Sequence, residues 1–153
     1  MEELIHVIYT SSVVPEISEH DTLKFLNRAR TVNRQHDVSG MMLYIGGFFL
    51  QLLEGEAAKV DVVCGAIFRD KREMQSILRE AIAEREFPEW TMGFEVVEPL
   101  EAGRLLGDAQ LFDSAARCPC ISSDSAKTLV SIIGRRLWQS DRSGMFRAIR
   151  RAG

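Results

Sequence analysis

Residues 38–55 have the sequence VSGMMLYIGGFFLQLLEG. This segment predicts two β-strands joined at Gly46-Gly47, because paired glycines adopt the positive φ values that a tight hairpin turn requires. Both strands are rich in Met, Leu, Ile and Phe, so at least one face of the hairpin should lie against a core. Gln51 interrupts this apolar pattern, since it shares a strand face with Phe49 and Leu53. An amide buried there without partners would cost about 1–3 kcal/mol, so we expect backbone groups or a bound ligand to hydrogen-bond to it.

The segments around the hairpin alternate between strand and helix patterns. Residues 4–9, LIHVIY, predict a strand, and Ser18-x-x-Asp21 resembles a capping box at the start of a helix whose apolar stripe ends at Asn33. Residues 57–70 predict a second amphipathic helix, on which Cys64 serves as a small core residue. Further strands are predicted over residues 76–83 and 91–97. One face of the last of these strands should carry four apolar side chains, those of Trp90, Met92, Phe94 and Val96.

This order of elements predicts an α+β fold of the ferredoxin-like type. The plan is β-α-β-β-α-β closed by a further strand, which gives a mixed, mainly antiparallel five-stranded sheet with two helices on one face. Beyond Pro99 we expect a short helix over residues 100–106 and an amphipathic helix opened by Ser122 or Ser123. These helices should cap the other sheet face, which would otherwise expose a large apolar surface. The expected division is a domain over residues 1–98 and a C-terminal helical cap over residues 99–153.

The composition excludes several classes of protein. With 153 residues, 46% of them hydrophobic and 27% charged, the chain has an ordinary globular composition. It has no run of about 20 apolar residues, and its start, MEELIHVIYTSS, is acidic where a secretion signal would be basic, so we expect a cytoplasmic protein without a membrane span. The three cysteines, Cys64, Cys118 and Cys120, fit neither a disulfide framework nor a common metal site, and we expect reduced thiols and no metal.

Arginine gathers at the C-terminus. Between Arg135 and Arg151 there are six arginines and one acid, Asp141, so this segment carries +5 while the whole chain carries −3. A solvated helix face is the usual meaning of such a run, and an acidic protein partner is the alternative. We expect nucleic acid less than protein as a partner, because only two aromatic residues, Trp138 and Phe146, stand among the six arginines.

Four side chains are out of place in the same way, each lying on a predicted apolar face: Tyr9, Asn33, Gln51 and Met92. In a ferredoxin-like sheet the first and third strands are central neighbours, so Tyr9 and Gln51 should lie close together. Each residue also has a structural interpretation. A half-buried Tyr can reach water or a carbonyl, Asn can cap a helix end, and Met can fill a gap in a core.

The motifs along the chain resemble those of the BLUF family, the flavin-binding sensors of blue light, from about Leu4 to Val97. The resemblance is carried by LIHVIYTS, by SGMMLY after Asn33, by FFLQLLEG, by the helix ending IFRDKR and by REFPEWTMGF. It implies FAD as the cofactor, with FMN or riboflavin as alternatives, bound between the two helices of the domain over residues 1–98. Tyr9 is similar in position to the family's photochemical tyrosine and Gln51 to its switching glutamine.

The resemblance also implies the other flavin contacts. Asn33 would hydrogen-bond the flavin ring, Ile67 would pack against it, and Arg72 would approach the ribityl or phosphate part. Trp90 and Met92 would report the light state to the surface. The sequence departs from the family pattern on the phosphate side at three positions, Ala29, Val32 and Glu73. The full set of implied cofactor-binding residues is Tyr9, Ser11, Asn33, Met42, Gln51, Ile67, Asp70, Arg72, Trp90 and Met92.

A mechanism and an output follow from this resemblance. Light would drive electron and proton transfer from Tyr9 through Gln51, and the amide would then settle in a new hydrogen-bond arrangement. The change would pass through the last strand and the C-terminal helices to a separate signalling protein, from a chain that is not an enzyme and that forms a homo-oligomer. Two other interpretations remain. A flavin-dependent redox enzyme would need an electron-donor site and an opening at the flavin N5, and the sequence shows no dinucleotide fingerprint or second pocket motif. A cofactor-free ferredoxin-like interaction module would be colourless.

Overall fold

The computed structural model describes residues 3–12, 18–68, 74–108, 111–112 and 121–142. Nine helices and strands lie within these residues. The strands are β1 (Leu4–Ser12), β2 (Ser39–Ile45), β3 (Phe48–Glu56), β4 (Met74–Ala81) and β5 (Gly93–Val96). The helices are α1 (Glu19–Gln35), α2 (Ala57–Phe68), α3 (Pro99–Leu105) and α4 (Ser123–Arg142).

The five strands form one sheet in the order β4-β1-β3-β2-β5. The contacts β4-β1, β1-β3 and β3-β2 are antiparallel, and β5 joins the edge of β2 in parallel. The β2-β3 hairpin turns at Gly46 and Gly47, whose φ angles of 51° and 100° lie in the left-handed region that favours glycine. This topology confirms the predicted α+β, ferredoxin-like fold with one further strand.

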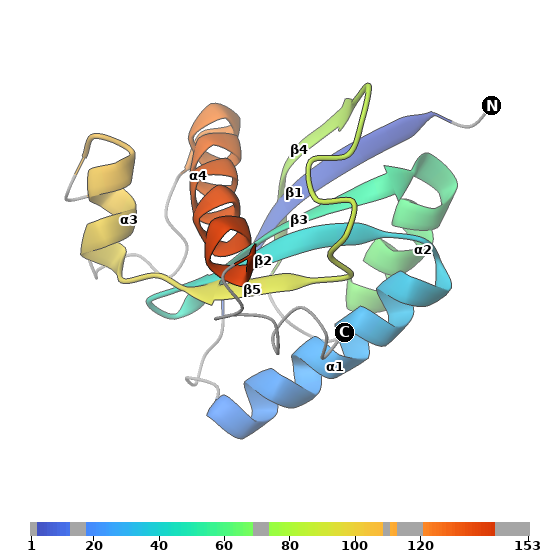
Figure 1. Cartoon of the computed structure of the whole chain (residues 1–153), viewed down its shortest axis with the longest axis horizontal. Helices are drawn as coiled ribbons and strands as arrows, with labels where there is room; N and C mark the ends of the chain where they lie inside the picture. Colours follow the sequence, from blue (N-terminus) through green and yellow to red (C-terminus); the bar gives the residue numbers. More distant parts are fainter. Residues whose placement is uncertain (1–2, 13–17, 69–73, 109–110, 113–120, 143–153) are drawn as a thin grey trace.

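Helices cover both faces of the sheet (Figure 1). On one face α1 and α2 pack on an apolar cluster that contains Leu26, Val60 and Phe49. On the other face α4 packs on a second cluster that contains Leu52 and Leu129. The predicted helical cap is therefore present, and each face of the sheet has a core of its own.

Serine side chains mark where two helices begin. The Ser18 hydroxyl accepts a hydrogen bond from the Asp21 N–H at 3.1 Å, as the predicted capping motif requires. Ser122, rather than Ser123, opens α4, because its hydroxyl accepts from the Ser125 N–H at 3.1 Å. Helix α2 is described as far as Phe68, and its predicted end at Asp70 lies outside the described residues.

Two ion pairs connect α4 to the sheet and to α3. Lys127 of α4 contacts Glu80 of β4 with 2.7 Å between Nζ and Oε1. Arg136, also on α4, contacts Glu101 of α3 with 3.0 Å between Nη1 and Oε1.

Of the helices that the structure describes, none combines the length and the apolar character needed to cross a membrane.

Candidate functional site

Three buried side chains form a row across the centre of the sheet. Tyr9 of β1 lies directly opposite Gln51 of β3, and Gln51 lies directly opposite Met42 of β2. Directly opposed residues point to the same face of a sheet, with Cβ atoms about 4.5–5.5 Å apart. Tyr9 is 3% exposed and Gln51 is 2% exposed. The prediction that Tyr9 and Gln51 lie side by side is therefore confirmed, and both face α1 and α2.

Met92, immediately before β5, completes this row from the edge of the sheet. The Gln51 Nε2 group donates a hydrogen bond to the Met92 Sδ atom at 3.7 Å. Thioether sulfur is a weak acceptor, so this contact costs little to break. The buried amide thus has a partner that it can exchange for another.

Helix α1 brings two further polar side chains to the same place. Asn33 is fully buried, and its Nδ2 group donates to the main-chain carbonyl of Thr91 at 2.6 Å. Arg30, one turn earlier, is 3% exposed and donates from Nε to the main-chain carbonyl of Met92 at 3.0 Å. Both side chains therefore hold the residues just before β5 against α1.

Each of these two side chains also has one buried polar atom to which the described structure gives no hydrogen-bond partner. Within the described part of the chain, the Oδ1 atom of Asn33 and the Nη2 group of Arg30 have no hydrogen-bond partner. An unsatisfied buried donor or acceptor costs about 1–3 kcal/mol, so native proteins seldom leave two of them together. One acceptor and one donor next to the Tyr9-Gln51 row indicate a place for a polar ligand.

A protein-family comparison identifies this arrangement. The family described as "BLUF: Sensors of blue-light using FAD" matches residues 4–93, which is more than half of the chain. The chain belongs to the BLUF family. It is a blue-light sensor that binds a flavin, and its BLUF region contains Tyr9, Gln51, Asn33 and Met92.

Solved BLUF structures share the fold. The chain is 27% identical to BlrB, a BLUF protein in its dark state, with a TM-score of 0.67 over 88% of this chain and 98% of that one. It is 28% identical to a bacterial light-regulated adenylyl cyclase, with a TM-score of 0.57 over 61% of this chain and 28% of the cyclase. The photo-activated state of BlsA is 19% identical with a TM-score of 0.70, over 84% of this chain and 93% of BlsA, and it shows the fold alone. Comparison with curated protein sequences finds no match.

The two buried atoms without partners match the ring edge of a BLUF flavin in their donor and acceptor character. The pyrimidine part of a flavin presents one N–H donor between two carbonyl acceptors. The Oδ1 atom of Asn33 is an acceptor and the Nη2 group of Arg30 is a donor, so together they match such an edge.

Burial also fixes the protonation of the groups around this BLUF site. It raises the pKa of Tyr9 well above its usual value of 10, and the nearby Cys64 thiol adds to the shift. Burial likewise raises the pKa of Cys64 to about 11, with Asp61 contributing. Both groups are therefore neutral at physiological pH. Burial lowers the pKa of Arg30, whose guanidinium is nevertheless the charged form at neutral pH.

The prediction that Trp90 shares a face with Met92 is wrong. Met92 belongs to the cluster under α1 and α2, whereas Trp90 belongs to the cluster under α4. The physical reason is that β5 begins only at Gly93, and the chain turns before it, with the Trp90 N–H bonded to the Phe87 carbonyl at 3.2 Å. The indole ring packs over Gly93, where a Cβ would lie 2.6 Å from it.

The remaining predicted site residues differ in how far the structure describes them. Ser11 is buried on β1, two residues from Tyr9 and on the same face. Ile67 lies in the last turn of α2, and its side chain lies outside the described residues. Asp70 and Arg72 lie outside them as well, as do Glu73, Cys118, Cys120 and the arginines from 147 onward. Among the residues that are described, no group of three or more His, Cys, Asp or Glu side chains could hold a metal ion.

Sequence reasoning missed Arg30. Arginine on a helix usually extends into solvent, and nothing in the local pattern shows that its guanidinium is covered. One signal was present, because Arg30 falls one turn before Asn33 and beside Leu26 and Ala29 on the helix. A charged residue next to an apolar stripe that contains a buried amide is therefore a candidate site residue as well.

Proposed function

We propose that this BLUF protein senses light through Tyr9 and Gln51 and passes the change on through Met92. The observation that carries the proposal is the arrangement of Gln51, which lies opposite Tyr9 and donates from Nε2 to the Met92 Sδ atom at 3.7 Å. One amide therefore lies between the phenol and the segment that leads into β5. A change in its hydrogen bonding would reach both of its neighbours.

A bound flavin supplies the absorption of blue light and, once excited, an acceptor for one electron. Tyr9 is the donor in this proposal. Its raised pKa keeps the phenol protonated in the dark, and a phenol loses its proton readily only when it also loses an electron. The Gln51 carbonyl oxygen accepts that proton, and the proton returns to Tyr9 when the electron returns. An amide serves here because it has separate donor and acceptor ends.

The rearrangement of Gln51 needs little energy. Its bond to the Met92 sulfur is weak, and rotation of the amide or a change of its tautomer exchanges donor for acceptor without any movement of the backbone. The two states then differ by a hydrogen-bond pattern, which is a local switch that a second element must read. We assign this second element to Met92 and to the segment before β5.

The flavin would lie between α1 and α2 in contact with the sheet. Asn33 and Arg30 would hold the ring edge with the two atoms described above, and Met42 and Ser11 would contact it from the sheet. Ile67, Asp70 and Arg72 remain the proposed contacts from the end of α2 onward, where the phosphate side would begin. We propose FAD, which the family description names. FMN is the alternative, since a structure of BlrP1 from Klebsiella pneumoniae is described as containing FMN.

The output would be contact with a separate protein in the cytoplasm. Residues 1–98 would form the flavin-binding domain and residues 99–153 the cap that responds to it. Support comes from α4, which packs on the sheet face opposite Gln51 and carries Arg135 and Arg136 on its exposed surface. An acidic surface on the partner, or on a second copy of this chain, would match this charge.

An absorption spectrum recorded before and after blue illumination tests the proposal. We expect flavin bands that shift under light and return in darkness. A colourless protein purified with flavin available would contradict flavin binding, and flavin bands that do not change under light would contradict the switch.

A further inference from the structure

Glu54 is a buried carboxylate on the face of the sheet that α4 covers, whereas Gln51 lies on the face that α1 and α2 cover. It lies three residues after Gln51 on β3, so the two side chains point to opposite faces. Glu54 is 0% exposed, although its neighbours Leu50 and Leu52 on that face belong to an apolar cluster. A buried carboxylate needs hydrogen-bond donors, and the identity of these donors tells what it holds.

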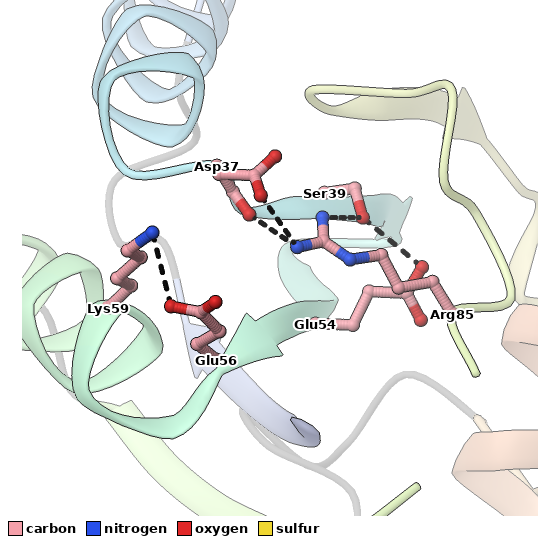
Figure 2. A network of polar contacts seen from close by, with 6 residues as sticks. All are labelled: Asp37, Ser39, Glu54, Glu56, Lys59 and Arg85. Atoms are coloured by element: carbon pink, nitrogen blue, oxygen red, sulfur yellow. Dashed lines mark hydrogen bonds and ion pairs between the residues drawn. The ribbon is translucent and has the colours of Figure 1, made fainter. Parts of the chain in front are cut away.

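The donors are two main-chain amides and one hydroxyl. The Glu54 Oε2 atom accepts from the Glu86 N–H at 2.9 Å, and Oε1 accepts from the Phe87 N–H at 2.5 Å. Oε1 also accepts from the Ser39 hydroxyl at 3.3 Å, as Figure 2 shows. Burial raises the pKa of Glu54, and these three hydrogen bonds oppose the rise. The carboxylate therefore fastens the loop between β4 and β5 to the centre of the sheet.

Arg85 fastens the same loop to the end of α1. Its Nη1 group donates to the Ser39 hydroxyl at 3.1 Å, and its Nη2 group donates to the Asp37 main-chain carbonyl at 2.7 Å and carboxylate at 3.3 Å (Figure 2). Asp37 has a φ of 53° in the turn that follows α1. Residues 85–87 are thus held from β2, from β3 and from the helix that carries Asn33.

This loop connects the flavin side of the sheet with the cap side. Phe87 stacks on Trp90 with ring centroids 5.7 Å apart and planes 1° apart. The Phe87 ring also lies against Gly134 of α4, where a Cβ would be too close to its Cε1 and Cζ atoms. Five residues after Phe87, Met92 lies on the other face of the sheet, where its sulfur accepts from Gln51. A movement at Met92 can therefore reach α4 through five residues of main chain and through the packing of Phe87 against Gly134.

We propose that Glu54 is a positioning residue of the light response, which holds residues 85–92 so that Met92 stays beside Gln51 and Phe87 stays against α4. This inference rests on the proposed function of Gln51 and Met92. It assigns to Glu54 no contact with flavin. Its role is to keep residues 85–92, in which Met92 contacts the Gln51 amide, from moving independently of the sheet.

The test replaces Glu54 by Gln and uses Glu56→Gln as the matched control. A Gln amide offers one acceptor oxygen, and its NH2 end faces a main-chain N–H, so one of the two loop amides loses its partner. Glu56 lies two residues further along the same strand and pairs with Lys59 at the surface, at 3.1 Å. The control therefore makes the same chemical change and keeps the two hydrogen bonds from the loop amides to Glu54. Ser39→Ala, which removes the hydroxyl between Arg85 and Glu54, is a second variant.

Two readouts separate this inference from the proposed function. Amide hydrogen exchange in the dark should be at least about tenfold faster at residues 86 and 87 in Glu54→Gln, because a weakened hydrogen bond opens more often. After blue light, Glu54→Gln should show the spectral shift of the wild type, but the shift should decay at least about threefold faster, because a freed Met92 follows Gln51 back at a lower barrier. Ser39→Ala should change both in the same direction by less, and Glu56→Gln should match the wild type.

The outcomes are decisive in both directions. Unchanged exchange at residues 86 and 87, or a decay in Glu54→Gln that is unchanged or slower, would overturn the positioning role. A wild-type protein with no spectral shift would instead contradict the proposed function. The exchange experiment would still show whether Glu54 holds the loop.

Discussion

Tyr9 and Gln51 are directly opposed in the antiparallel ladder between β1 and β3, on the face of the sheet that α1 and α2 cover. This places a phenol and an amide next to each other on two interior strands, where the backbone is hydrogen-bonded on both sides. A switch built there can change side-chain hydrogen bonds while the strands stay in place. In the function that we propose, the moving parts are Gln51 itself and the less regular segment that ends in Met92.

Asn33→Ala should weaken flavin binding. The variant removes the buried acceptor that we assign to the flavin ring, with an expected loss of about 1–3 kcal/mol in binding free energy. This corresponds to a dissociation constant about five- to 150-fold higher. Titration of the apoprotein with FAD, followed by flavin fluorescence, measures it. Asn27→Ala, at an exposed position of the same helix, is the control and should bind like the wild type. Equal affinities for the two variants would remove Asn33 from the site.

Gly134→Ala should destabilise the protein, although alanine favours helices. The new Cβ would lie 2.4 Å from the Phe87 ring, which cannot withdraw because Trp90 stacks on it. Overpacking of this kind costs about 1–3 kcal/mol, more than the gain of about 1 kcal/mol in helix propensity. Gly65→Ala on α2, where a Cβ meets nothing within 4 Å, should show only the gain. Urea unfolding should separate the two variants by about 2 kcal/mol. Two equally stable variants would contradict the close packing of α4 on Phe87.

Tyr9 should make the protein sensitive to alkaline pH. Burial raises its pKa in the folded state above the usual value of 10, so its contribution to stability is complete below pH 10. Above pH 10 the unfolded chain loses this proton while the folded chain keeps it. The free energy of unfolding should then fall by up to about 1.4 kcal/mol per pH unit more in the wild type than in Tyr9→Phe. Urea unfolding from pH 9 to pH 11 measures both slopes, and equal slopes would mean that Tyr9 is not buried as a neutral phenol.

The central part of the site could be predicted because it depends on regular structure. Strand order and the two-residue alternation of side chains are enough to bring Tyr9 beside Gln51, and helical spacing is enough to turn Asn33 toward them. The same alternation failed at Trp90. It was extended backward past Gly93, into a turn where the rule for strands does not hold.

The charged residues around the site could not be predicted from local patterns. Arg30 contacts the carbonyl of Met92, 62 positions further along the chain, and Glu54 contacts amides 32 and 33 positions away. Periodicity describes only the element on which a residue lies. Whether a charge meets partners or solvent depends on where loops from distant parts of the chain pass over it.

The most direct test of the switch compares the flavin-loaded wild type with Gln51→Leu by absorption spectroscopy, before and after blue illumination. Leucine fills similar space but has neither the acceptor for the Tyr9 proton nor the donor for the Met92 sulfur. We expect both proteins to bind flavin, with a reversible light-induced shift in the wild type and none in Gln51→Leu. A normal shift in Gln51→Leu would contradict the role of the amide.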